Sequence, residues 1–161
     1  MKSGAIIDAF LLSNPVHRGM VECLILVGTG ICGLMFSWIK FSIFPVSNIL
    51  GGLLMLSAFA FHWWAHKEHK QAHERPEDID TLVTSGVYAK IRHPLYLSLI
   101  FLNIGIALSF GVMITFILAL LTIVHWIPTS LKEEEILLQR FPDAYKQYKL
   151  AVRWRMIPGI F

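Results

Sequence analysis

Two long apolar stretches occupy the first part of the chain. Residues 20–39 and residues 46–64 carry only one charged side chain between them, that of Glu22. Because a helix needs roughly 20 mostly apolar residues to cross the hydrocarbon core of a bilayer, each stretch is long enough to do so. Residues 40–45 leave room only for a tight reversal, so the pattern predicts two antiparallel membrane helices.

A longer uncharged stretch follows in the second half of the chain. Residues 95–127 contain 33 positions without a charged side chain, which as one helix would measure about 50 Å. Since that length exceeds the hydrocarbon thickness, we expect two antiparallel helices at 95–109 and 111–127, with Gly111 allowing the turn. Pro128 is expected to end the second of them, so the chain is predicted to cross the membrane four times.

The composition agrees with a membrane protein rather than a soluble enzyme. Hydrophobic residues make up 55% of the chain and charged residues 16%, and the mean hydropathy is +0.60. Of the 14 lysines and arginines, only Lys40 lies on the outer side of the predicted arrangement. An excess of basic residues marks the cytoplasmic side of a membrane. We therefore expect one all-α, multi-pass integral membrane domain over residues 1–161, with both termini cytoplasmic and no nucleic-acid partner.

The residues of chemical interest fall in two cytoplasmic segments, a connector at residues 65–94 and an amphipathic tail at residues 128–161. Pro94 is expected to begin the third span, because proline is favoured at the first helical position. The start of a helix attracts anions, and Arg92 beside it adds a positive charge. In the alternative interpretation, Arg92 reaches lipid phosphate and His93 only caps the helix.

The tail is expected to begin with an amphipathic helix that opens on three consecutive glutamates. At about 100° per residue, Glu134 falls in the middle of the apolar face, and Glu133 and Glu135 lie on its two flanks. A charge on a buried face near a membrane needs a cationic partner. Glu134 is therefore expected either to pair with Arg92 or Lys90, or to receive a cationic ligand.

These motifs occur in an order that is similar to that of a known family. The motifs are T-L-V-T-S-G-V-Y at residues 81–88, R-H-P-L-Y at residues 92–96, a helical hairpin, and then Glu133, Glu134, Leu137, Phe141, Tyr145 and Tyr148. Together they closely resemble the isoprenylcysteine carboxyl methyltransferase family and, more distantly, the phospholipid N-methyltransferases. The resemblance extends from Thr81 to the C-terminus.

The resemblance implies a membrane-embedded methyltransferase that uses S-adenosyl-L-methionine and has no Rossmann domain. In that family the cofactor lies at the cytoplasmic end of the C-terminal helical hairpin, enclosed by the connector and the tail. The positions that correspond to the family's cofactor contacts are Thr81, Leu82, Val83, Tyr88, His93, Pro94, Leu95, Tyr96 and Glu133. Gly86 belongs to the turn before Tyr88, and Glu134 completes the glutamate pair.

The chemistry of these residues suits that cofactor. S-adenosylmethionine carries a carboxylate, which suits the helix start beside Arg92, and two cationic groups, which suit a glutamate. Tyr88 and Tyr96 can pack on the adenine or, by cation–π attraction, on the sulfonium. The helical periodicity favours Glu134 as the main contact, whereas the resemblance places Glu133 first, so both are candidates.

The acceptor of the methyl group is expected to be a lipophilic molecule that enters from the bilayer and carries a carboxylate, a thiol or an amine. Thr129 stands where the prenylcysteine methyltransferases carry an arginine thought to hold the substrate carboxylate. An amine acceptor needs a general base, for which His125 is the candidate because it lies two helical turns before Glu133. Alternatively, His125 is a hydrogen-bonded residue between the helices. Arg92 and His125 are the candidate catalytic residues.

Two other functions are compatible with the sequence. Four histidines share one predicted helix face: His62, His66, His69 and His73. Histidines one turn apart can share a metal, as a metal-dependent membrane oxidase requires. The other histidines are scattered along the chain, so we expect no metal site and interpret the stripe as an extension of the second span. The third hypothesis is a non-catalytic membrane scaffold.

Overall fold

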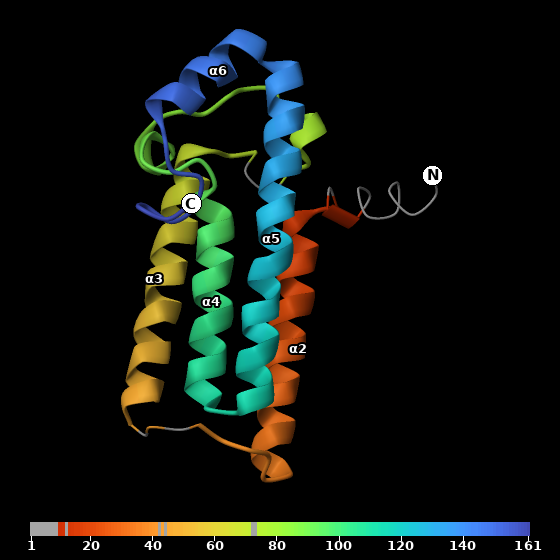
Figure 1. Cartoon of the computed structure of the whole chain (residues 1–161), viewed down its shortest axis with the longest axis vertical. Coiled ribbons are helices and arrows are strands. Elements are labelled where there is room, and N and C mark those ends of the chain that lie inside the picture. The colour runs from red at the N-terminus through yellow and green to blue at the C-terminus, as the bar shows by residue number, and fades with distance from the viewer. Residues whose placement is uncertain (1–9, 12, 42, 44, 72–73) are drawn as a thin grey trace.

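The long helices of the molecule run side by side along its long axis (Figure 1). The computed structural model describes residues 10–11, 13–41, 43, 45–71 and 74–161. The long helices are α2 (Pro15–Met35), α3 (Val46–Glu68), α4 (Pro94–Phe110) and α5 (Met113–Arg140). The shorter elements are α6 (Pro142–Ala151) and two 3-10 helices in the connector, η1 (Pro76–Asp78) and η2 (Gly86–Ala89). Because the described residues form helices and no strand, the predicted all-α architecture is confirmed for this part of the chain.

Helix α2 begins earlier than the apolar pattern predicted. Its first residue is Pro15, and the side chain of Asn14 accepts hydrogen bonds from the backbone N–H groups of Val16 and His17, at 2.9 and 3.4 Å. An asparagine cap followed by proline favours a helix start even where the first turn is polar. The helix also ends earlier than predicted, at Met35.

Helices α3 and α4 pack with their backbones close together. A Cβ atom added to Gly51 of α3 would lie 2.7 Å from the carbonyl oxygen of Gly105 in α4. This approach of two helix backbones therefore depends on glycine, which has no Cβ atom. Helix α3 extends beyond its predicted end to Glu68 and carries the first part of the histidine stripe.

Helices α4 and α5 form the predicted hairpin. Helix α4 begins at Pro94, as expected, and Gly111 follows its last residue with a φ of +66°, in the left-handed region that favours glycine. Within the described part of the chain, α2, α3 and α5 are long and apolar enough to cross a membrane, and α4 is a shorter apolar helix. The count of four crossings therefore stays a prediction.

Helix α5 does not end at Pro128, so that prediction was wrong. It continues to Arg140, and the glutamates lie inside it rather than opening a separate helix. Proline removes one backbone donor, but membrane helices continue through proline where hydroxyl groups and packing support the turn. Here the hydroxyl of Thr129 donates to the carbonyl of His125 at 2.8 Å.

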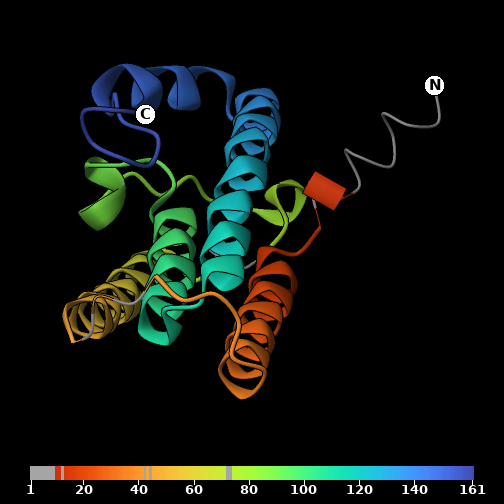
Figure 2. The same cartoon turned by 60° about the horizontal axis from the view of Figure 1, so that its bottom comes forward.

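The connector and the tail meet at the end of the molecule where α6 lies across the helices (Figures 1 and 2). Ile91 and Trp154 form an isolated parallel bridge. The backbone N–H of Arg92 donates to the carbonyl of Trp154 at 3.0 Å, and that of His93 donates to Arg155 at 2.8 Å. These bonds hold the tail against the start of α4.

Candidate active site

A polar cleft lies between the connector, the start of α4 and the C-terminal third of α5. Two cavities of about 30 Å³ each share Tyr88, Arg92 and Glu133 in their walls, so they form one cleft. Most of the residues predicted to contact a cofactor line it: Thr81, Leu82, Val83, Tyr88, His93, Pro94, Leu95, Tyr96 and Glu133. The walls do not include Gly86 or Glu134. The structure thus gathers residues from three separate segments around one space.

Glu133 lines the cleft from α5. Its Oε2 atom accepts a hydrogen bond from the Tyr96 hydroxyl at 2.6 Å and lies 3.3 Å from Nδ1 of His93. The rings of His93 and Tyr96 are stacked, with their centroids 5.4 Å apart. Two side chains at the start of α4 therefore hold the carboxylate, which still has 16% of its side chain exposed. A carboxylate in this position can receive a cationic group.

Glu134 lies outside the cleft, within a cluster of cations. Its carboxylate is 2.9 Å from Nε of Arg92, 2.8 Å from Nε of Arg155 and 3.3 Å from Nζ of Lys149. Nε2 of His93 also lies 3.3 Å away. The predicted ion pair between Glu134 and Arg92 is thereby confirmed. With 4% of its side chain exposed, Glu134 is a buried charge whose cations come from the connector and the tail, so it ties both to α5.

Arg92 lines the cleft and also anchors the tail. Its Nη1 atom donates to the carbonyl oxygens of Val152 and Arg153, at 2.6 and 3.0 Å, while its Nε atom donates to Glu134. The side chain is buried. Because its donors are directed to protein groups, this geometry favours a positioning role over contact with lipid phosphate.

The surroundings of His93 favour its protonated form. Burial lowers the pKa of His93, but the nearby carboxylates of Glu133 and Glu134 outweigh burial, so the pKa is raised above the ordinary value of 6.5. The charged imidazolium then bridges the two glutamates. Burial acts in the opposite sense on Tyr88, where it raises the pKa of the hydroxyl and keeps the phenol neutral.

A tight turn in the connector places Tyr88 in the cleft. Gly86 has a φ of +59°, and a Cβ atom there would overlap the side chain of Glu68. The carbonyl of Tyr88 accepts a hydrogen bond from the Tyr148 hydroxyl of α6 at 2.8 Å. Gly86 therefore allows the backbone conformation of the turn that was predicted before Tyr88, and Tyr88 forms part of the cleft wall.

Six further residues line the cleft that were not among the predicted site residues: His69, Glu74, Ile79, Leu137, Tyr145 and Tyr148. The ring of His69 packs edge-on against Tyr88, with centroids 5.7 Å apart. Burial lowers the pKa of His69. Its place in the histidine stripe, directly after α3, was the available signal.

The structure does not bring His125 to the cleft. Its Nε2 atom lies 2.8 Å from the carboxylate of Glu22, and its ring lies against Trp126 with centroids 4.7 Å apart. The residue lines a separate groove between α2 and α5. This geometry favours the location of the alternative prediction, between the helices, where His125 lies next to Glu22.

The histidine stripe also has non-metal contacts. The Nδ1 atom of His62 lies 3.4 Å from the Ser98 hydroxyl, and His69 contacts Tyr88. Across the described ranges, no group of three or more His, Cys, Asp or Glu residues could hold a metal ion. His73 lies outside the described residues.

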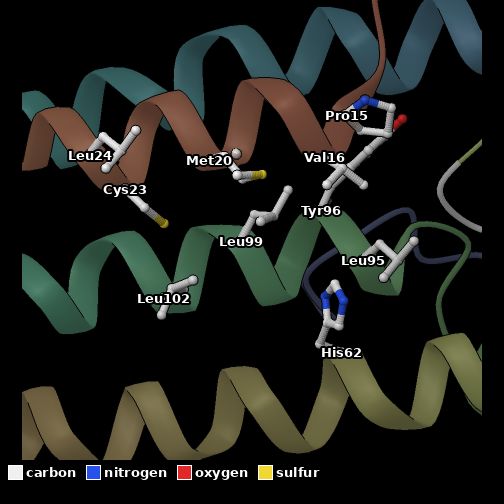
Figure 3. Close-up of a pocket in the computed structure, with 11 residues that line it drawn as sticks. Pro15, Val16, Met20, Cys23, Leu24, His62, Leu95, Tyr96, Leu99 and Leu102 are labelled. Carbon is white, nitrogen blue, oxygen red and sulfur yellow. The ribbon is translucent and has the colours of Figure 1, made fainter.

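A large apolar groove adjoins the cleft on the side of the membrane helices. It has a volume of about 660 Å³ and is lined by α2, α4 and His62 of α3. Figure 3 shows side chains of α2, such as Met20 and Cys23, pointing across it toward α4. Leu95 and Tyr96 line both the groove and the cleft. The two spaces therefore meet at the first turn of α4.

The fold and the cleft together define a helical protein with apolar, membrane-length helices and a charged site where they meet the connector. The sequence model of phospholipid methyltransferases matches residues 46–144, which contain α3, α4, α5 and most of the cleft wall. The chain therefore belongs to the phospholipid methyltransferase family, and it is a membrane methyltransferase by that membership. No match to the chain is found among curated proteins.

Proposed function

We propose that the protein transfers a methyl group from S-adenosyl-L-methionine to a lipophilic acceptor in the membrane. The observation that carries this proposal is the junction of two unlike spaces at Leu95 and Tyr96, a small charged cleft and a large apolar groove. Transfer between a polar donor and a lipid-like acceptor needs such a junction, because reacting atoms must approach to about 3–3.5 Å.

The residues of the cleft fit the charges of this cofactor. The carboxylate of Glu133 suits an ammonium or a sulfonium, and Tyr88 and Tyr96 add aromatic faces that attract cations. The first N–H groups of α4 suit a carboxylate. When bound, the cofactor supplies a methyl group activated by its attachment to positively charged sulfur.

Binding of a nucleoside requires the cleft to widen. Its two cavities measure about 30 Å³ each, far less than a nucleoside occupies. The connector supplies one wall through Thr81, Leu82 and Val83, whereas Glu133 belongs to the long helix α5. We expect the connector to move outward and α5 to stay in place, because a segment of short turns yields more readily than a packed helix.

The groove between α2 and α4 suits the apolar body of the acceptor. Its volume of about 660 Å³ lies within the range of small-molecule ligand sites, and its walls are mainly leucine, methionine and valine side chains. The head of the acceptor, a carboxylate, a thiol or a lipid amine, then reaches the cleft beside Tyr96. The isoprenylcysteine-like role is one form of this proposal.

Binding of S-adenosylhomocysteine to the purified full-length protein tests the cofactor site. The substitution Glu133→Gln keeps the shape of the side chain but removes its charge. We expect it to weaken binding by about tenfold or more, the effect of losing a charge-assisted hydrogen bond. Isothermal titration calorimetry in detergent measures the dissociation constant.

The neighbouring glutamate provides a matched control. Glu135 is exposed and forms a salt bridge with Lys132 at 3.0 Å, so Glu135→Gln is expected to bind the ligand as the wild type does. Equal affinity in wild type, Glu133→Gln and Glu135→Gln would reject the site. A screen with radiolabelled methyl donor against prenylated peptides, phospholipids and small thiols then identifies the acceptor.

A further inference from the structure

Arg18 is a buried positive charge inside a membrane-length helix. It lies in the first turns of α2, and only 8% of the residue is exposed. An arginine side chain keeps its charge in proteins. A buried charge in a membrane helix is costly unless it is compensated, and such residues commonly mark functional sites. The contacts of Arg18 therefore indicate what compensates it.

The contacts that the structure shows for Arg18 are neutral. Its Nη1 atom donates to the hydroxyl of Thr129 at 2.9 Å. The guanidinium lies over the rings of Trp126 and Phe10, 4.6 and 5.6 Å from their centroids. Its buried Nε atom meets no hydrogen-bond acceptor, and no carboxylate pairs with it, among the residues that the structure describes. The guanidinium thus retains a donor directed to no protein group.

Glu22, the nearest carboxylate along α2, accepts two hydrogen bonds from other residues. Asn103 donates to its Oε2 atom at 2.6 Å and the Trp126 indole donates at 3.2 Å. Its Oε1 atom lies 2.8 Å from Nε2 of His125. These contacts come from α4 and α5, and no ion pair joins Glu22 to Arg18 among the described residues.

Arg18 lines a groove that has a polar end and an apolar wall, as a site for a lipid requires. The groove lies between α2 and α5, which run side by side in both views (Figures 1 and 2), and has a volume of about 510 Å³. Arg18, Glu22 and His125 lie at its polar end. Its remaining wall is largely apolar, formed by Val21, Ile25, Leu26, Leu118 and Leu121. This groove and the acceptor groove are lined by different faces of α2.

We propose that the α2–α5 groove binds a phospholipid with a net negative headgroup. The headgroup anion meets the guanidinium of Arg18 where this side chain lines the groove, and an acyl chain lies along the apolar wall. Charge complementarity selects the anionic lipid, because a guanidinium binds phosphate oxygens with strong charge-assisted hydrogen bonds. This site is separate from the cleft and does not depend on the proposed reaction.

Lipid binding to the full-length protein in detergent tests this site. The probes are phosphatidylglycerol and phosphatidylcholine with identical acyl chains, titrated and counted by native mass spectrometry. We expect the wild type to bind phosphatidylglycerol about tenfold more tightly than phosphatidylcholine, the effect of one charge-assisted contact. In Arg18→Gln, which retains a donor for Thr129, the two affinities should become equal.

Two further variants separate the site from general effects. Val21→Trp fills the groove but leaves Arg18 in place, and should weaken phosphatidylglycerol binding at least as much. The control variant is Arg153→Gln. Arg153 is exposed and also lies over a tryptophan, 5.2 Å from the centroid of the Trp154 ring. This variant should bind phosphatidylglycerol as the wild type does. The proposal is overturned if the wild type shows no preference for the anionic lipid, or if Arg18→Gln and Val21→Trp both retain it. Calorimetry with S-adenosylhomocysteine on the same samples measures ligand binding in the cleft independently.

Discussion

Glu133, Glu134 and Glu135 follow one another on α5, yet each has a different environment. The first faces the cleft, the second is buried among cations, and the third is exposed over 61% of its side chain. The helical period predicted this separation, because consecutive residues point about 100° apart. It did not predict that Arg155 and Lys149 pair with Glu134, because Lys149 lies in α6 and Arg155 beyond it, and no local pattern links them to α5.

The residues predicted to contact the cofactor could be identified from the sequence mainly through the family resemblance. Spacing alone identified the helix start at Pro94 and the turn at Gly86, both of which the structure confirms. The distance of His125 from the cleft could not be predicted. A position on a helix wheel depends on which neighbours pack against each face, and the partner Glu22 belongs to α2, about a hundred residues earlier.

The charge of His93 makes the free energy of unfolding of the protein depend on pH. Because its folded-state pKa is raised, the stabilisation is fully present below the ordinary value of 6.5 and is lost as pH rises through the raised value. We therefore expect the melting temperature of the wild type in detergent to exceed that of His93→Gln at mildly acidic pH. The difference should shrink toward alkaline pH. A difference that stays constant across this range would contradict a charged His93.

At the scale of elements, α5 shows where a sequence rule failed. The rule that proline ends a helix predicted a break at Pro128, but a membrane helix keeps its hydrogen bonds within itself because lipid offers no alternative partners. The helix therefore continues past Pro128 to Arg140 and carries the glutamates. This continuity fixes the glutamates to the same rigid body as the membrane part of the helix.

The close packing of α3 and α4 predicts opposite effects at two adjacent glycines. A Cβ atom on Gly51 would lie 2.5 Å from the hydroxyl oxygen of Ser109, whereas a Cβ atom on Gly52 would meet nothing within 4 Å. We expect Gly51→Ala to destabilise the protein by about 1–3 kcal/mol through overpacking. Gly52→Ala should stabilise it by up to about 1 kcal/mol, through helix propensity.

Thermal unfolding followed by circular dichroism in detergent compares these two variants with the wild type. The matched pair changes the same atoms on the same helix, so detergent effects cancel. Equal melting temperatures for Gly51→Ala and Gly52→Ala would show that the helices are further apart than the structure indicates.

At the scale of the whole molecule, the polar segments gather at one end of the helices, and Lys40 lies at the other end beside the hairpin turn. Lys40 and Val112 form a bridge there. This separation agrees with the charge asymmetry of the sequence, from which the cytoplasmic location of both termini was predicted.

Labelling from one side of the membrane tests that orientation. In a background with Cys23→Ser and Cys32→Ser, single cysteines replace exposed Lys40 or exposed Lys146. A membrane-impermeant maleimide added to intact cells should label Lys40→Cys and spare Lys146→Cys until the cells are lysed. Labelling of Lys146→Cys in intact cells would reverse the predicted orientation.

The bonds from Arg92 and His93 to Trp154 and Arg155 have a consequence for synthesis of the protein. The ribosome makes the connector and the hairpin well before it makes residues 154–155, so the backbone N–H groups of Arg92 and His93 acquire these partners only after those residues have been synthesised. The cleft therefore matures later than the apolar helices. A chain interrupted before residue 154 inserts its apolar helices but leaves these N–H groups without their partners and Glu134 without Arg155, a state that quality-control proteases can recognise.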